Sequence, residues 1–123
     1  MQIFLDTAEI DVVKSHMETG LIDGVTTNPS LILKSGTELN TRIKELVEAG
    51  VPDISAEVVG ETAAEMLSMA ETLVPLGSSV TIKVPCTMEG LKACKQLSLQ
   101  GTRVNVTLVF SVSQAILSAK AGA

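Results

Sequence analysis

The sequence predicts an α/β fold of parallel strands, because two features of its 123 residues agree. Five short runs rich in Val, Ile and Leu alternate with five segments whose apolar residues recur at helical spacing. No two-residue hairpin turn separates two neighbouring runs. Strands linked by crossover helices must run parallel, and their nearly continuous apolar character is typical of a buried parallel sheet.

The first half of the chain carries two of these strand–helix pairs. The apolar run at 2–7 predicts a strand, and three apolar residues at helical spacing predict a helix over 8–20. A second strand is expected at 21–27, before the turn-forming residues Asn28-Pro29-Ser30. An amphipathic helix is expected over 37–49, with a glycine directly behind it.

The second half of the chain adds three more pairs. Strands are expected at 53–59, 79–84 and 103–110, followed by helices at 61–74, 87–99 and 111–121. Thr87 opens the fourth of the five helices. Ser111 can serve as the N-cap of the last one, and Gly122 ends it.

Repeated units of about 20 to 30 residues suit either a doubly wound sheet or a (β/α)8 TIM barrel. The first strand–helix turn lacks Gly-x-Gly-x-x-Gly and no P-loop occurs, so we favour the barrel. A complete barrel takes about 250 residues. Residues 1–123 are therefore expected to form the N-terminal part of one barrel domain, about its first five βα units. Its open sheet edges favour association, so a homo-oligomer is expected.

Composition excludes several classes of function. The net charge of −5, without a basic cluster, argues against nucleic acid or an anionic membrane as partner. No signal peptide or membrane-spanning run is recognisable, which favours a soluble, cytoplasmic protein with Cys86 and Cys94 as free thiols. His16 is the only histidine and lies on a polar helical stretch, so we expect neither a metal site nor a cofactor.

Polar side chains appear late in each of the five predicted strands. They are Asp6, Thr26, Asn28, Glu57, Lys83, Asn105 and Thr107. Because the active sites of βα barrels lie where strands end, we expect these side chains to converge. Small polar residues commonly terminate strands, which would account for the threonines alone. That explanation extends less well to an aspartate, a glutamate and a lysine within apolar runs.

Lys83 lies between β-branched residues in Val80-Thr81-Ile82-Lys83-Val84-Pro85 and has two interpretations. A buried ammonium is costly unless it pairs with a carboxylate or loses its proton. The lysine could thus close a structural ion pair or extend to solvent. It could instead be a neutral nucleophile that forms a Schiff base with a ketone, with Asp6 or Glu57 moving the protons.

Two long motifs resemble the transaldolase family, in its small transaldolase and fructose-6-phosphate aldolase-like branch. They are Asp23-Gly24-Val25-Thr26-Thr27-Asn28-Pro29-Ser30-Leu31-Ile32 and the segment from Val80 to Leu91, VTIKVPCTMEGL. The resemblance implies a class I, metal-independent mechanism on a (β/α)8 fold. It implies Lys83 as the Schiff-base lysine, Asp6 as acid/base, and Glu57 with Thr107 as the pair that positions a water. Asn28, Asn105 and Thr26 would contact the dihydroxyacetone unit.

The resemblance also implies sugar phosphate substrates. Glutamate at position 57 resembles transaldolases, whereas the aldolase type has glutamine. This favours transfer of a dihydroxyacetone unit from sedoheptulose 7-phosphate to glyceraldehyde 3-phosphate, in the pentose phosphate pathway. The alternatives are a fructose-6-phosphate aldolase and a truncated, inactive βα fragment that self-associates. The family's phosphate-gripping serine and arginine would lie beyond residue 123.

Overall fold

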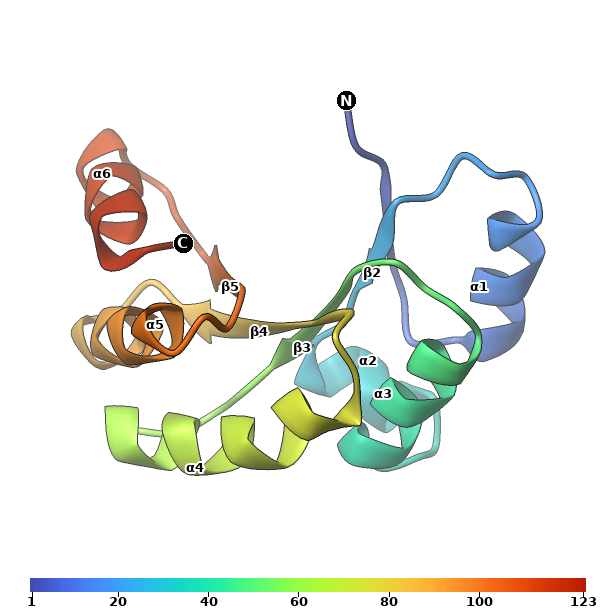
Figure 1. Cartoon of the computed structure of the whole chain (residues 1–123), viewed down its shortest axis with the longest axis horizontal. Coiled ribbons are helices and arrows are strands. Elements are labelled where there is room, and N and C mark those ends of the chain that lie inside the picture. The colour runs from blue at the N-terminus through green and yellow to red at the C-terminus, as the bar shows by residue number, and fades with distance from the viewer.

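The computed structural model describes all 123 residues as a curved parallel sheet with helices around its outer side (Figure 1). The strands are β1 (Phe4–Asp6), β2 (Gly24–Thr26), β3 (Ile54–Glu57), β4 (Val80–Pro85) and β5 (Val104–Thr107). Their spatial order equals their chain order, and each neighbouring pair is parallel. The predicted α/β architecture with five βα units is confirmed.

Six α-helices and a short 3-10 helix connect and follow the strands. They are α1 (Ile10–Met17), α2 (Pro29–Lys34), α3 (Leu39–Glu48), α4 (Ala63–Leu73), η1 (Val74–Leu76), α5 (Met88–Leu99) and α6 (Val112–Ala121). Thr87 and Ser111 cap α5 and α6 through their side chains, as expected. Gly122 ends α6 at a φ of 107°, which favours glycine. None of the helices is both long and apolar enough to cross a lipid bilayer.

The structure corrects two predicted boundaries near the ends of β2 and β5. Asn28-Pro29-Ser30 begins α2 instead of a simple turn, because the Asn28 side chain accepts the amide of Leu31 and Pro29 suits the first helical position. The last strand ends at Thr107 and not at 110. Leu108 lies in the left-handed region with a φ of 63°, which turns the chain out of the sheet.

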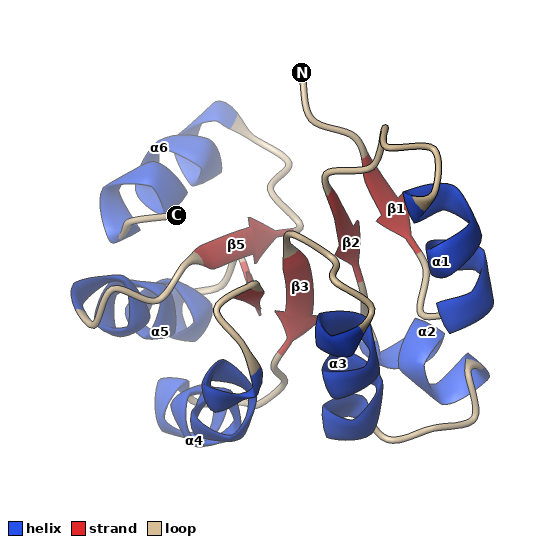
Figure 2. Cartoon of the chain, turned by 45° about the vertical axis from the view of Figure 1, so that its right-hand side comes forward, coloured by secondary structure: helices blue, strands red, loops and turns tan.

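Alternation along the strands separates the core from the inner face of the sheet. Ile54, Ala56, Ile82 and Val84 point outward and are fully buried. The helices pack against this outer face (Figure 2) and complete the core with apolar residues such as Leu46 and Met66. The intervening residues point to the concave side, so the core holds the sheet while the opposite face remains free for polar groups.

Candidate active site

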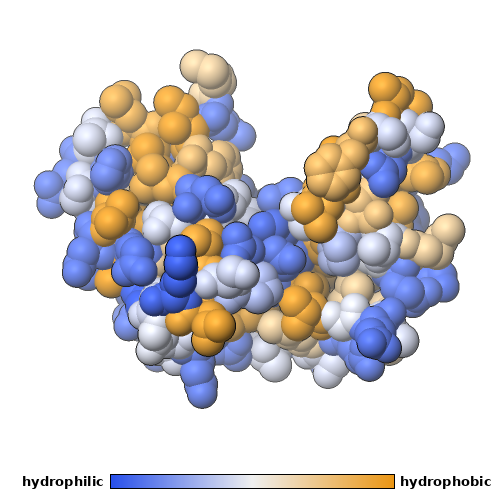
Figure 3. All heavy atoms as spheres, turned by 180° about the vertical axis from the view of Figure 1, so that it is seen from behind, coloured by the Kyte–Doolittle hydropathy of each residue, from blue (hydrophilic) through white to orange (hydrophobic).

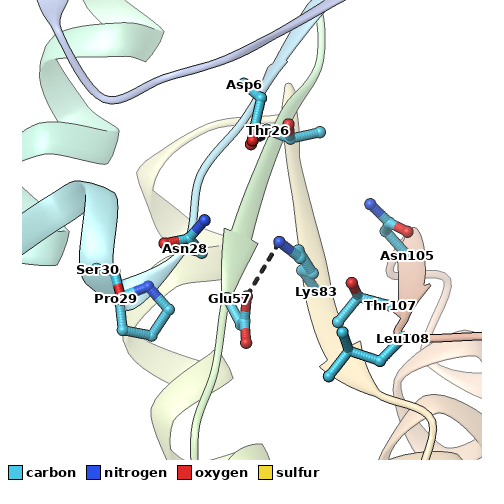
Figure 4. Close-up of a pocket in the computed structure, with 10 residues that line it drawn as sticks. All are labelled: Asp6, Thr26, Asn28, Pro29, Ser30, Glu57, Lys83, Asn105, Thr107 and Leu108. Atoms are coloured by element: carbon cyan, nitrogen blue, oxygen red, sulfur yellow. Dashed lines mark hydrogen bonds and ion pairs between the residues drawn. The ribbon is translucent and has the colours of Figure 1, made fainter.

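A cavity of about 660 Å3 opens at the carboxyl ends of the strands (Figure 4). The residues that line it are Asp6, Thr26, Asn28, Pro29, Ser30, Glu57, Lys83, Asn105, Thr107 and Leu108. All seven residues that the sequence singled out are among them, so their predicted convergence is observed. Pro29, Ser30 and Leu108 are lining residues that the sequence reasoning did not select.

Lys83 is the best enclosed of the charged groups in the cavity. Its flanking residues Ile82 and Val84 are anchored in the core, which forces the lysine to the concave side, where it is 9% exposed. The amine Nζ donates to Glu57 Oε2 at 3.0 Å and to the backbone oxygen of Thr27 at 3.0 Å. Two acceptors therefore compensate the cost of burying this ammonium.

The Glu57–Lys83 pair results directly from strand register. Glu57 lies opposite Lys83 across the β3–β4 ladder, so the two side chains leave the sheet on the same face. Figure 4 shows this ion pair as a dashed line. An ion pair was one of the interpretations of Lys83 that the sequence allowed. The other interpretation, a nucleophilic amine, is compatible with the same position because Nζ borders the cavity and its partner can accept its proton.

Asp6 and Thr26 form a second pair at the β1–β2 side of the cavity. They are opposite each other in register, and the Thr26 hydroxyl donates to Asp6 Oδ1 at 2.9 Å. This bond leaves Asp6 Oδ2 without a protein partner, and the carboxylate is exposed. Asp6 therefore offers a free acceptor on the side of the cavity formed by β1 and β2.

The two asparagines are held by different contacts. Asn28 Oδ1 caps α2 by accepting the Leu31 amide at 2.9 Å, so its amide nitrogen remains available to a ligand. Asn105 lies opposite Lys83 across the β4–β5 ladder and donates from Nδ2 to Ser55 Oγ at 3.1 Å. The Asn105 carbonyl is then free to accept a hydrogen bond. The buried Ser55 was not anticipated, although its place two residues before Glu57 puts it on the same face.

Thr107 and Leu108 form the last side of the cavity, where β5 ends. Thr107 pairs in register with Pro85 and makes no hydrogen bond through its hydroxyl within the protein. The left-handed backbone of Leu108 is costly for a residue with a branched side chain, and such strain is concentrated at functional sites. Nothing in the sequence indicates it, because leucine rarely adopts this conformation.

The site combines one basic side chain with two carboxylates and several uncharged hydrogen-bonding groups. Lys83 is the only basic residue among those that line the cavity. No three His, Cys, Asp or Glu side chains gather closely enough to hold a metal ion. Cys86, just beyond Lys83, contacts the Ser118 hydroxyl at 3.7 Å and does not line the cavity.

Comparison with solved structures shows the fold. The chain matches the crystal structure of a candidate phosphonomutase from Burkholderia cenocepacia J2315, with a TM-score of 0.72 and 11% sequence identity. The match covers 98% of this chain and 65% of that one. At this identity the likeness concerns the fold alone, and it confirms the prediction of a partial (β/α)8 barrel.

Comparison with known sequences shows the family. The family model for transaldolase/fructose-6-phosphate aldolase matches residues 3–123. Proteins named "Probable transaldolase" from Paracoccus denitrificans and Erythrobacter litoralis are 50% and 55% identical over the whole chain. The chain spans 57% of the length of each of these relatives. The protein therefore belongs to the transaldolase/fructose-6-phosphate aldolase family.

Proposed function

We propose that this chain carries the Schiff-base centre of a transaldolase, with Lys83 as the nucleophile. The observation that supports this most directly is the Lys83 amine, which borders a polar cavity and lies 3.0 Å from the Glu57 carboxylate. A structural ion pair alone would not need a surrounding cavity with a second carboxylate and two asparagines. The remaining lining groups suit a hydroxyl-rich ligand, because most of them offer hydrogen bonds and only Pro29 and Leu108 have apolar side chains.

In the first step, Glu57 accepts a proton from the Lys83 ammonium and frees the lone pair of Nζ. The amine attacks the ketone carbon of a ketose phosphate, and a proton passes from the attacking nitrogen to the carbonyl oxygen, which gives a neutral carbinolamine. Glu57 then gives its proton to the carbinolamine hydroxyl, which leaves as water, and an iminium remains between Lys83 and the sugar. Glu57 and the unbonded hydroxyl of Thr107 would position a second water molecule that relays protons during this step.

In the second step, the iminium takes up the electron pair of the neighbouring carbon–carbon bond. Asp6 removes the proton of the hydroxyl at the carbon that leaves as an aldehyde, and an enamine remains on Lys83. An acceptor aldehyde can then bind, and the reverse sequence forms the new bond and takes the proton back from Asp6. Hydrolysis of the resulting iminium regenerates the lysine.

The substrates we propose are sedoheptulose 7-phosphate as donor and glyceraldehyde 3-phosphate as acceptor, as in the pentose phosphate pathway. Asn28 and Asn105 would hold the dihydroxyacetone hydroxyls through the free amide nitrogen of one and the free carbonyl of the other. Thr26 would keep Asp6 oriented through its 2.9 Å bond. The glutamate at position 57 supports transfer over simple cleavage only through its resemblance to transaldolases.

Borohydride trapping tests this proposal without requiring turnover. The chain is incubated with the ketose phosphate, reduced, and analysed by intact mass and peptide mapping. We expect one covalent adduct, at Lys83, and none in Lys83→Met. Lys92→Met, which removes an exposed lysine from α5, should label like the unmodified chain. Absence of an adduct on a chain with intact secondary structure would rule out Schiff-base chemistry in these 123 residues.

Two alternatives remain as candidates. Direct cleavage of fructose 6-phosphate is the other activity that the family description names. It would release glyceraldehyde 3-phosphate without an acceptor, so a coupled assay with and without acceptor distinguishes the two reactions. The second alternative is an inactive fragment that self-associates. The unpaired edges of β1 and β5 support it, because exposed strand edges can pair with another chain. Light scattering would then show a homo-oligomer, and the trapping experiment would show no adduct.

A further inference from the structure

We propose that Ser55 is a positioning residue of the candidate active site and orients the Asn105 side chain through its buried hydroxyl. The inference rests on the proposed function, in which Asn105 holds a hydroxyl of the ketose phosphate. Ser55 is 2% exposed and does not itself line the active-site cavity. Its Oγ accepts from Asn105 Nδ2 at 3.1 Å, and this is the only hydrogen bond that the Ser55 hydroxyl makes within the protein.

Strand register places Ser55 in a row of hydroxyl side chains beneath the charged groups of the site. Ser55 lies two residues before Glu57 on β3, so both side chains leave the sheet on its concave face. Ser55 is in register with Thr26 on β2 and with Thr81 on β4. Figure 3 shows a hydrophilic hollow between two more apolar projections, which agrees with polar side chains on the concave face.

Thr81, the neighbour of Ser55 in this row, has a different partner. Its hydroxyl donates to Asp53 Oδ1 at 2.7 Å, and the other oxygen of Asp53 is held by Arg103 at 2.9 Å. None of these three residues lines the active-site cavity. Ser55 instead bonds Asn105, which does line the cavity. Thr81 is therefore a buried hydroxyl of the same row without a link to the site.

The backbone of Ser55 is held in place by Thr27. The carbonyl oxygen of Ser55 accepts from the Thr27 amide at 3.0 Å and from the Thr27 hydroxyl at 2.9 Å. Thr27 is fully buried, and its own carbonyl oxygen accepts from Lys83 Nζ at 3.0 Å. Because its backbone is fixed in this way, Ser55 offers Asn105 an acceptor at a defined position. A binding group supported by such a contact is oriented before the ligand arrives.

The contact decides which end of the Asn105 amide is free. The last side-chain torsion of asparagine is broad and roughly two-fold, so an unrestrained amide presents either its carbonyl or its NH2 group. Donation of Nδ2 to Ser55 leaves Oδ1 of Asn105 as the free end, an acceptor for a ligand hydroxyl. Asn28 has the opposite end free, because its carbonyl caps α2. The two asparagines therefore offer one acceptor and one donor to neighbouring hydroxyls of the ligand.

NMR spectroscopy of the side-chain amides tests the positioning without any reaction. The NH2 signals of Asn105 in the isotope-labelled chain are identified by their loss in Asn105→Ala. In Ser55→Ala the heteronuclear NOE of this NH2 group should fall, because the amide is free to rotate. Thr81→Val also removes a buried hydroxyl of the row and should leave this NOE unchanged. An unchanged NOE in Ser55→Ala would overturn the inference, whether or not a Schiff base forms.

Borohydride trapping at increasing ketose phosphate concentrations measures the consequence for binding. In Ser55→Ala the half-saturating concentration for labelling of Lys83 should rise about three- to tenfold, the usual effect of one hydrogen bond. Labelling at saturation should stay the same, since Lys83 and Glu57 are unaltered. Because Ser55 acts through Asn105, adding Ser55→Ala to Asn105→Ala should cause no further rise. An equal rise in both backgrounds would indicate a purely structural effect and overturn the inference.

The two experiments separate this inference from the proposed function. If the unmodified chain is labelled and Ser55→Ala has the same half-saturating concentration, the inference fails and the Schiff-base proposal stands. If neither chain is labelled, the Schiff-base proposal fails, and the NOE of the Asn105 amide still decides whether Ser55 orients it.

Discussion

Glu57 and Lys83 lie directly opposite each other on β3 and β4, with their charged groups 3.0 Å apart. Each side chain is mostly buried, so water screens the pair only in part. In the proposed mechanism, the carboxylate that forms this ion pair is also the group that accepts the proton of Lys83. On this proposal, the stability of the site and its reactivity depend on the same contact.

Removal of the carboxylate should destabilise the protein. In Glu57→Ala the ammonium of Lys83 stays enclosed with only the Thr27 carbonyl as acceptor, and we expect a loss of about 2 to 3 kcal/mol in the free energy of unfolding. Urea denaturation measures this loss in the free energy of unfolding. Adding Lys83→Met to Glu57→Ala should recover part of the loss, because no charge is then left buried.

Glu48→Ala is the control, because it breaks the exposed pair with Lys44 and should change the free energy of unfolding by less than about 0.5 kcal/mol. An equal loss in the two single variants would contradict the prediction.

Gly90 is expected to be intolerant of any side chain. A Cβ at this position would lie 1.9 Å from the backbone oxygen of Pro85, at the end of the strand that carries Lys83. The helix α5 could remain only by moving away from β4, so Gly90→Ala should cost about 3 kcal/mol or more. Thermal unfolding compares it with Lys95→Ala, an exposed position on the same helix. A stable Gly90→Ala variant would show that α5 can shift without loss.

The capping box of α4 should make part of the stability dependent on pH. The backbone amides of Thr62 and Glu61 donate to the Glu65 carboxylate and lower its pKa from the usual 4.5. A carboxyl group whose pKa is lower in the folded state than in the unfolded state stabilises the fold when the pH is above its unfolded-state pKa. This contribution is lost as the pH falls through its folded-state pKa.

The measurement compares the unmodified chain with Glu65→Gln in urea between pH 7 and pH 3. The variant should be less stable at neutral pH, and the difference should shrink as the pH falls below about 4.5. Glu71→Gln, an exposed carboxyl on the same helix, serves as the control and should show no such convergence. A difference that persists unchanged to pH 3 would exclude the proposed capping contribution.

The two cysteines should differ in reactivity. Burial raises the pKa of the Cys94 thiol above its usual value, while the nearby Lys95 lowers it by less. Cys94 is enclosed in the core between the sheet and α5, whereas Cys86 is half-buried. A thiol reagent at neutral pH should therefore label Cys86 first and reach Cys94 only in denaturant. The variants Cys86→Ser and Cys94→Ala show which thiol is labelled under each condition, and fast labelling of Cys86→Ser in buffer would contradict the prediction.

The convergence of the site could be predicted because it follows from two general rules. Parallel strands of a barrel present their carboxyl ends at one mouth, and side chains two residues apart share a face. Asn105 and Thr107 illustrate the second rule, since both line the cavity from β5. The first rule brings Asp6 and Lys83 together, although 76 residues separate them in the chain. Neither rule needs the details of packing.

The contacts between the side chains of the site do not follow from the sequence alone. Strand register made Glu57 the partner of Lys83, and register is set by packing over the whole sheet. The bond between Asn105 and Ser55 has the same origin, since it joins β5 to β3 across the concave face. The helix α2 was missed although its signals are present, because a helix of six residues is too short for a periodic pattern. The left-handed Leu108 has no local signal at all.

The alternation along β4 has a consequence for how this sequence can change. Ile82 and Val84 face the helices and Lys83 faces the hollow, so a single strand carries core residues and the proposed nucleophile in direct succession. Insertion or deletion of one residue before Lys83 would exchange the two faces, placing an amine under α4 and α5 and an aliphatic chain beside Glu57. Point substitutions can alter one face while preserving the other. Length changes in this strand would disrupt both faces at once, so β4 should tolerate insertions and deletions poorly.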